Sequence, residues 1–287
     1  ACLCLAMLAL LQSVGTLQIQ HLLFSWWMLP ALLLHFASLA LFILAWHTLL
    51  SGHSTHRFSY RECLAQIGVT LTGKYLPGKI WGLLGRSYLL TRRGVSPGNA
   101  LHLLIADQFL TFYSGAVAIG LGVLLIVAPA VAALAAVLVA VLSPVLLSSY
   151  QHLAGWLETR PALRNRTISQ EADQPGKNST TTTDPVTSVL EPARLLRVAL
   201  VYFLHWLGLS VALALLFYPA LADNFARLCL LLIIAVPAGM LTGFLALWAP
   251  AGIGVREAVM VGVLGTGVSF ELAAAIALVY RLLCIGN

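Results

Sequence analysis

The sequence predicts an all-α fold: a polytopic integral membrane protein with about seven to eight transmembrane helices and two re-entrant segments broken by proline and glycine. Of its 287 residues, 60% are hydrophobic and only 9% are charged, and the mean hydropathy is +0.93. A soluble domain carries about 25% charged residues, so this chain has too little polar surface to cover a globule in water. Its apolar runs are continuous and about 20 residues long, as helices that cross a bilayer require.

The apolar runs fall into two groups separated by one long polar stretch. They cover about residues 1–14, 27–50, 99–128, 130–150, 196–219, 228–247 and 270–287. Residues 153–195 are rich in Thr, Ser, Pro and Asp and cannot bury a core, so we expect a flexible cytoplasmic linker there. The linker divides the chain into a first membrane half, 1–152, and a second, 196–287. Because apolar runs are already under way at Ala1 and still continuing near Asn287, we expect both ends to be trimmed.

Lysine and arginine gather in alternate connections between these runs. Placing 51–62, 86–97 and 153–195 on one face leaves Arg227 alone in the opposite loops, and the basic face is expected to be cytoplasmic. This orientation requires each broken segment to dip into the membrane and return to its own side. The net charge of +6 belongs to these loops and does not indicate nucleic-acid binding.

The two broken segments are 63–90 in the first half and 248–267 in the second. The first contains LTGKYLPGKIWGLLGR and the second LTGFLALWAPAGIGVRE, so each joins Leu-Thr-Gly to a proline, glycines and an arginine. The spacing from proline to arginine differs, which makes the internal similarity weak. Interrupted apolar segments at matching positions in two halves nevertheless indicate a transporter binding site.

The charges of the first broken segment are its strongest functional signal. A lysine or arginine at mid-bilayer costs roughly 2.5–3.5 kcal/mol, and interrupted backbone is tolerated only where protein or water covers it. We therefore expect Lys74, Lys79 and Arg86 to line a hydrated pocket that holds an anion, and Asp107 to pair with Arg86 or Lys79. The alternative is a basic turn that only anchors the chain at the interface, with Asp107 in a purely structural pair.

In the second half, we expect Arg256 to face the pocket and Glu257 to pair with another segment, for example through Arg281. Here the alternative is a structural clamp at the end of a bent helix. The candidate substrate-binding residues are Lys74, Tyr75, Lys79, Trp81, Arg86, Asp107, Arg256 and Glu257. The residues expected to shape the two broken segments are Pro77, Gly78, Gly82, Pro250, Gly252 and Gly254.

The stretches KYLPGKIWGLLGR and PAGIGVRE resemble the two hallmark motifs of the lysylphosphatidylglycerol synthase transmembrane-region family. That family includes the lipid-flipping membrane domain of bacterial lysylphosphatidylglycerol synthases and stand-alone YbhN-like membrane proteins. The matching positions are Lys74, Tyr75, Pro77, Gly78, Trp81 and Arg86, then Pro250, Gly252, Gly254, Arg256 and Glu257. Where the family commonly has Pro-Gly-Gly, this chain has Pro250-Ala251-Gly252. The synthases' soluble aminoacyl-transferring domain has no counterpart in these residues, so the resemblance implies no synthase activity.

The resemblance and the charge pattern together predict a flippase-like protein of the bacterial inner membrane that binds and translocates an anionic phospholipid or polyprenyl-phosphate lipid. We expect no enzymatic activity, no cofactor and no metal site; the partners would be a lipid and, in one alternative, a transferase. The competing hypothesis is a membrane enzyme or accessory subunit for glycosyl or aminoacyl transfer to lipids, with Asp107 or Glu257 as general base.

Overall fold

The computed structural model describes residues 26–52, 57–73, 81–139, 141, 143, 191–246 and 248–285, and this part of the chain is helical, without strands. The all-α prediction is therefore confirmed. The elements are α3 (Met28–Leu50), α4 (Tyr60–Gly73), α5 (Trp81–Arg92), α6 (Pro97–Val127), α10 (Pro192–Leu216), α11 (Tyr218–Leu221), η1 (Ala222–Asn224), α12 (Phe225–Leu245), η2 (Pro250–Gly252), α13 (Val255–Leu264) and α14 (Phe270–Ile285). A shorter apolar helix, Pro129–Val139, follows α6.

Within the described residues, four helical stretches are long and apolar enough to cross a bilayer: α3, α6, α10 and Ala222–Leu245, which contains α12. They coincide with four of the predicted runs. The predicted run 1–14 lies outside the described residues, and 130–150 is described mainly as the helix Pro129–Val139. The run 270–287 forms α14, which has 16 residues.

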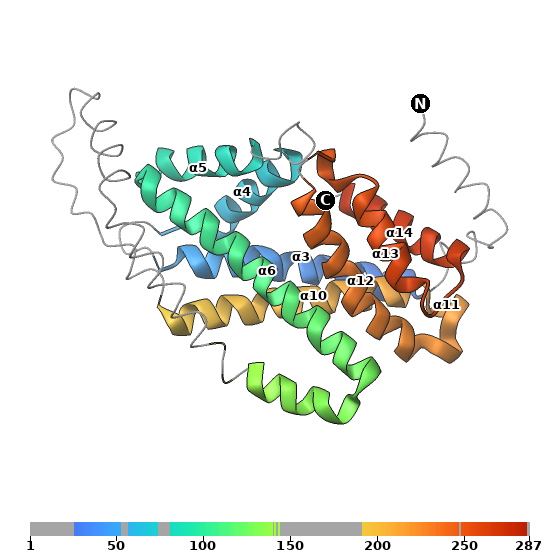
Figure 1. The fold of residues 1–287 in the computed structure, drawn as a ribbon. Coiled ribbons are helices and arrows are strands. Elements are labelled where there is room, and N and C mark those ends of the chain that lie inside the picture. Colours follow the sequence, from blue (N-terminus) through green and yellow to red (C-terminus); the bar gives the residue numbers. More distant parts are fainter. Residues whose placement is uncertain are drawn as a thin grey trace, which may run out of the picture.

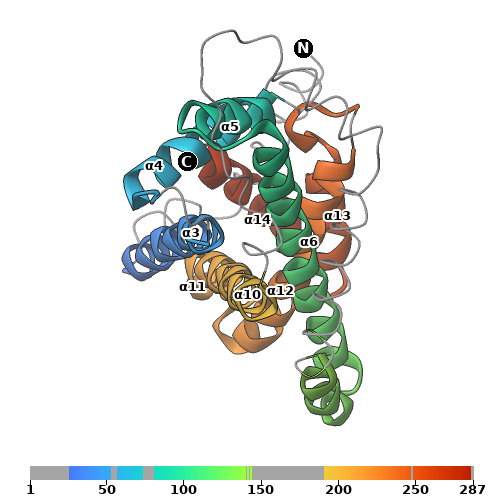
Figure 2. The same cartoon turned by 90° about the vertical axis from the view of Figure 1, so that its left-hand side faces the viewer.

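The long helices pack around α10. α3 lies against α10 along most of its length, and α6 and α12 pack against α10 and against each other (Figure 1). Figure 2 looks nearly along α3 and α10, which lie side by side with α4 and α5 above them. Because α3 ends where α4 and α10 begin, the ends of these helices that adjoin the predicted basic loops lie on one face of the molecule.

The start of α6 follows directly from its sequence. The Ser96 hydroxyl accepts a hydrogen bond from the Asn99 backbone N–H at 3.3 Å, and Pro97 occupies the first turn, where a missing N–H leaves no broken bond. From there α6 continues for 31 residues, or about 46 Å. It is therefore long enough to reach from one face of a bilayer to the other.

The first broken segment consists of two short helices packed against each other, α4 and α5 (Figure 1). They are about 21 and 18 Å long, each shorter than a bilayer core. A Cβ added to Gly73 would lie 2.5 Å from the backbone nitrogen of Gly82, and one added to Gly82 would lie 2.9 Å from Thr70. These glycines let the backbones of α4 and α5 touch where the end of α4 lies against the start of α5.

The second broken segment turns sharply after α12. Ala251, Gly252 and Gly254 have φ of 50°, 69° and 85°, which reverses the chain so that α13 runs back along α12. A Cβ added to Gly252 would lie 2.8 Å from the Gly243 backbone, so the turn presses directly on α12. α14 then packs against α13 and returns in the opposite direction.

Candidate functional site

Arg86 of α5 and Asp107 of α6 form a buried ion pair. Arg86 Nη1 lies 2.9 Å from Asp107 Oδ2, and the two side chains are 1% and 0% exposed. The predicted pairing of Asp107 with Arg86 is confirmed. An unpaired charge at this depth would be strongly disfavoured, whereas a paired and hydrogen-bonded one is tolerated.

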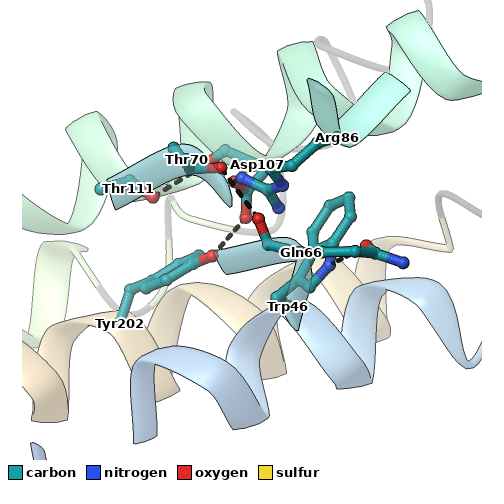
Figure 3. A network of polar contacts seen from close by, with 7 residues as sticks. All are labelled: Trp46, Gln66, Thr70, Arg86, Asp107, Thr111 and Tyr202. Atoms are coloured by element: carbon teal, nitrogen blue, oxygen red, sulfur yellow. Dashed lines mark hydrogen bonds and ion pairs between the residues drawn. The ribbon is translucent and has the colours of Figure 1, made fainter. Parts of the chain in front are cut away.

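The Arg86 guanidinium also lies over the indole ring of Trp46 in α3, with its carbon 3.8 Å from the ring centroid (Figure 3). At this distance the ring quadrupole attracts the cation, and burial strengthens the attraction. The indole N–H of Trp46 donates to Gln66 Oε1 of α4 at 2.8 Å, which fixes the ring orientation. Arg86 is therefore held by one aromatic partner, Trp46 of α3, and one acidic partner, Asp107 of α6.

Asp107 accepts a second hydrogen bond from the other side. The Tyr202 hydroxyl of α10 donates to Asp107 Oδ1, and the Thr111 hydroxyl donates to the Asp107 backbone carbonyl at 2.8 Å (Figure 3). Both carboxylate oxygens therefore have a donor. Through this one residue, the helices α5, α6 and α10 are tied together, and Trp46 and Gln66 add α3 and α4.

Two donor atoms of this network have no hydrogen-bond partner among the described residues. They are Nε and Nη2 of Arg86, both buried. A buried donor without an acceptor costs about 1–3 kcal/mol, and more on a charged group. Arg86 thus keeps two donors without an acceptor among the described residues inside a closed site.

The second pair of charges lies at the start of α13. Glu257 Oε2 accepts a hydrogen bond from the Gly254 backbone N–H at 2.7 Å, and Glu257 Oε1 lies 2.6 Å from Arg281 Nη1 of α14. The predicted pairing of Glu257 with Arg281 is confirmed. Glu257 both caps α13 and joins it to α14, because each of its carboxylate oxygens contacts a different element.

Arg256 points to the other side of α13, onto α12. Its side chain is 7% exposed, and a Cβ added to Gly243 would lie 3.4 Å from Arg256 Nε. Gly239 and Gly243, one turn apart on α12, leave the space that the arginine occupies. Arg256 Nε has no hydrogen-bond partner among the described residues, so it is a second buried guanidinium with an unsatisfied donor.

The other predicted site residues have mixed outcomes. Trp81 is 51% exposed at the beginning of α5, whereas Gly82 is buried against α4, and Pro250, Gly252 and Gly254 belong to the turn before α13. The remaining predicted residues lie outside the described part of the chain: Lys74, Tyr75, Pro77, Gly78 and Lys79.

The surroundings of Arg86 differ from the hydrated pocket that the sequence suggested. Arg86 and Asp107 are enclosed by side chains, so the structure shows a closed site. An apolar groove of about 290 Å³ lies beside it on the outer surface of α5 and α6, lined by Leu83, Leu101, Leu104, Ile105, Gln108 and Phe109. The polar network is thus separated from the surface by apolar side chains.

Three members of the site were not predicted from the sequence: Trp46, Gln66 and Tyr202. Gln66 carried a usable signal, because an amide inside an apolar segment needs a hydrogen-bond partner when buried. Trp46 and Tyr202 lie within continuous apolar runs, where aromatic residues are common, and their roles depend on how α3 and α10 pack against α5 and α6.

Comparison with known proteins adds the family. The family model described as "Lysylphosphatidylglycerol synthase TM region" matches residues 2–285. The chain belongs to this family. No curated protein and no solved structure shows a significant match. Together with its four long apolar helices, membership in the lysylphosphatidylglycerol synthase transmembrane-region family makes this chain a multi-pass membrane protein.

Proposed function

We propose that this member of the family binds an anionic lipid, a phospholipid or a polyprenyl phosphate, and translocates it across the bacterial cytoplasmic membrane. The observation that carries the proposal is the buried Arg86, whose Nε and Nη2 have no acceptor among the described residues. A lipid phosphate supplies negatively charged oxygens, and arginine binds such groups with paired, charge-assisted hydrogen bonds.

The position of Arg86 supports transport rather than simple anchoring. Asp107 lies about 15 Å along the α6 axis from Pro97, and Tyr202 lies a similar distance along α10 from Pro192. Such a distance from the helix ends favours a site inside the bundle over a basic turn that only anchors the chain at the interface. Burying a cation that far inside costs free energy, which a partner or a bound ligand has to offset.

We further propose that α4 and α5 form a re-entrant hairpin, supported by their short lengths and by the packing of α4 on α5. The second broken segment, 248–267, ends with Thr266 hydrogen-bonded to Arg227 at the start of α12, so it runs back along α12 and is not part of this proposal. The closed site is then one state of an alternating-access cycle. In that cycle the α4–α5 hairpin moves, the Arg86–Asp107 contact opens, and a phosphate replaces the carboxylate at Arg86.

The alternative of an enzyme with Asp107 or Glu257 as general base has less support. Both oxygens of Asp107 accept hydrogen bonds from Arg86 and Tyr202, and both oxygens of Glu257 are held by Arg281 and the Gly254 N–H. A carboxylate held by a cation is a weaker base than a free one. We therefore assign no chemical step to the chain.

The test is headgroup exchange between leaflets in liposomes that carry the purified protein. Arg86→Gln combined with Arg256→Gln should slow exchange of an anionic phospholipid by about ten-fold or more, because each variant removes charge-assisted hydrogen bonds of about 1.5–3 kcal/mol. The matched control is Arg61→Gln, which removes an exposed cation on α4. Equal rates for the wild type and the double variant would exclude the proposal.

Lipid mass spectrometry of a deletion strain separates this proposal from the enzyme alternative. Loss of a lipid species would indicate synthesis, whereas an intact species in the wrong leaflet would indicate transport.

A further inference from the structure

A second apolar groove lies at the other end of α6, between α6, α12 and α13. It has a volume of about 470 Å³, and its lining includes Val123, Ile126, Leu231, Ile234, Val263 and Thr266. The lining is almost entirely aliphatic. In a helix bundle that spans a bilayer, such a groove opens toward lipid rather than water.

This groove lies far from the Arg86 network. Val127, which lines it, is about 30 Å along α6 from Asp107. It is formed by the end of α6 and the beginning of α12, which lie at the opposite end of the bundle from the beginnings of α4 and α10 (Figure 1). The groove therefore belongs to the other leaflet.

A cation stands at the mouth of this groove. Arg227 is exposed in the first turn of α12, and its Nη2 donates to the backbone carbonyl of Thr266 at 3.1 Å. Leu231, one turn further along α12, lines the groove itself. Arg227 forms no ion pair with an acidic residue of the described chain, so its charge is available to a ligand.

Both apolar grooves lie on the same face of α6. Leu101, Ile105, Val123 and Ile126 recur at spacings that place them within one stripe of a helix with 3.6 residues per turn. Between the grooves, Phe112 on the same stripe packs edge-on against Phe244 of α12, with 5.0 Å between the ring centroids, so the two grooves are separate sites along one face of α6.

We propose that the groove between α6, α12 and α13, with Arg227 at its mouth, is a second binding site for an anionic phospholipid, in the leaflet opposite to the one at Arg86. An acyl chain fits the aliphatic lining, and the phosphate fits the free cation at the interface. The proposal rests on the proposed function, since it supplies the site where a translocated lipid arrives or departs.

The test is photo-crosslinking in nanodiscs with phosphatidylglycerol and phosphatidylcholine that carry a diazirine on one acyl chain, with the crosslinked peptides identified by mass spectrometry. In the wild type, phosphatidylglycerol should label the end of α6 and α13 about five-fold more than phosphatidylcholine does, the ratio expected for one interfacial arginine. In Arg227→Gln this preference should fall to about one.

Gly262→Leu should abolish labelling of the groove by either lipid, because Gly262 lines it and an added Cβ there meets nothing within 4 Å. The matched control is Gly68→Leu on α4, where a Cβ also has open space. This control should leave the labelling unchanged, and both variants should elute as monodisperse protein.

Two results would overturn the proposal. One is equal labelling by the two lipids in the wild type; the other is groove labelling that survives Gly262→Leu. The same experiment on the double variant Arg86→Met with Asp107→Leu, which leaves no buried charge without its partner, distinguishes the two proposals, because the groove should still be labelled when Arg86 is removed. If groove labelling persists and this variant exchanges lipid between leaflets at the wild-type rate, the second site stands and the proposed role of Arg86 fails.

Discussion

Asp107 is the residue on which the polar network depends. It accepts hydrogen bonds from Arg86 and from Tyr202, and the guanidinium that it neutralises is 1% exposed. Removing one member of a buried pair leaves the other charge without compensation, while removing both charges does not. The network should therefore respond very differently to single and double substitutions.

Asp107→Leu should destabilise the protein by about 3–5 kcal/mol, because Arg86 stays buried and charged without its partner. The double variant Arg86→Met with Asp107→Leu should regain most of this stability, since neither charge remains. Tyr202→Phe should cost less, about 1–3 kcal/mol, because it removes one hydrogen bond to the carboxylate. Thermal unfolding in detergent measures all three, and a double variant less stable than Asp107→Leu would contradict the prediction.

Stability and transport should separate in the double variant. If Arg86 only holds α5 to α6, restoring the fold with Arg86→Met and Asp107→Leu should restore leaflet exchange as well. If Arg86 binds lipid phosphate, the restored fold should remain inactive.

The Arg86–Asp107 and Glu257–Arg281 ion pairs were predictable from the sequence, whereas the roles of Trp46 and Tyr202 were not. Charged residues inside apolar segments are few, so Arg86 and Asp107, like Glu257 and Arg281, had few possible partners. Tyr202 and Trp46 are aromatic residues in apolar runs, and only the packing of α10 and α3 brings them to the ion pair. The closed state of the site could not be predicted either, because it depends on how α5 packs against α4 and α6.

At the scale of elements, the turn before α13 shows why the family commonly has Pro-Gly-Gly where this chain has Pro-Ala-Gly. Ala251 has φ of 50° and ψ of 18°, a left-handed conformation that side chains with a Cβ rarely adopt. Gly252 follows with φ of 69° and lies directly on Gly243 of α12. The turn therefore requires glycine at its second position and would be relaxed by glycine at its first.

Ala251→Gly should stabilise the protein by about 0.5–1 kcal/mol. It relieves the strain of the left-handed conformation, and this gain exceeds the extra conformational entropy that glycine loses on folding. Gly252→Ala should destabilise it, because the added Cβ would lie 2.8 Å from the Gly243 backbone. The control is Gly262→Ala within α13, where an added Cβ meets nothing within 4 Å; it should raise stability by about 0.5–1 kcal/mol, the helix-propensity difference between glycine and alanine, and so have the opposite sign to Gly252→Ala. Thermal unfolding midpoints that rank Ala251→Gly below the wild type would contradict this account.

At the scale of the whole molecule, the transport proposal depends on the helix arrangement, because the packing of the helices buries Arg86 and Arg256 inside the bundle. The sequence located the long spans correctly, because continuous apolar runs are a direct consequence of bilayer thickness. The path of 63–90 was harder to predict, because a broken apolar segment can either cross the membrane or return. The packing of α4 on α5 supports a return, and this topology can be tested directly.

Single cysteines placed in a cysteine-free variant should report which face each connection occupies. Arg57→Cys before α4 and Arg92→Cys at the end of α5 should both react with a membrane-impermeant maleimide from the cytoplasmic side, because a hairpin returns to its own face. Ser269→Cys, before α14, should react from the opposite side. All three positions are exposed, so access depends on topology rather than on burial. If Arg57→Cys and Arg92→Cys were labelled from opposite sides, 63–90 would cross the membrane, and the basic loops would then be divided between the two faces.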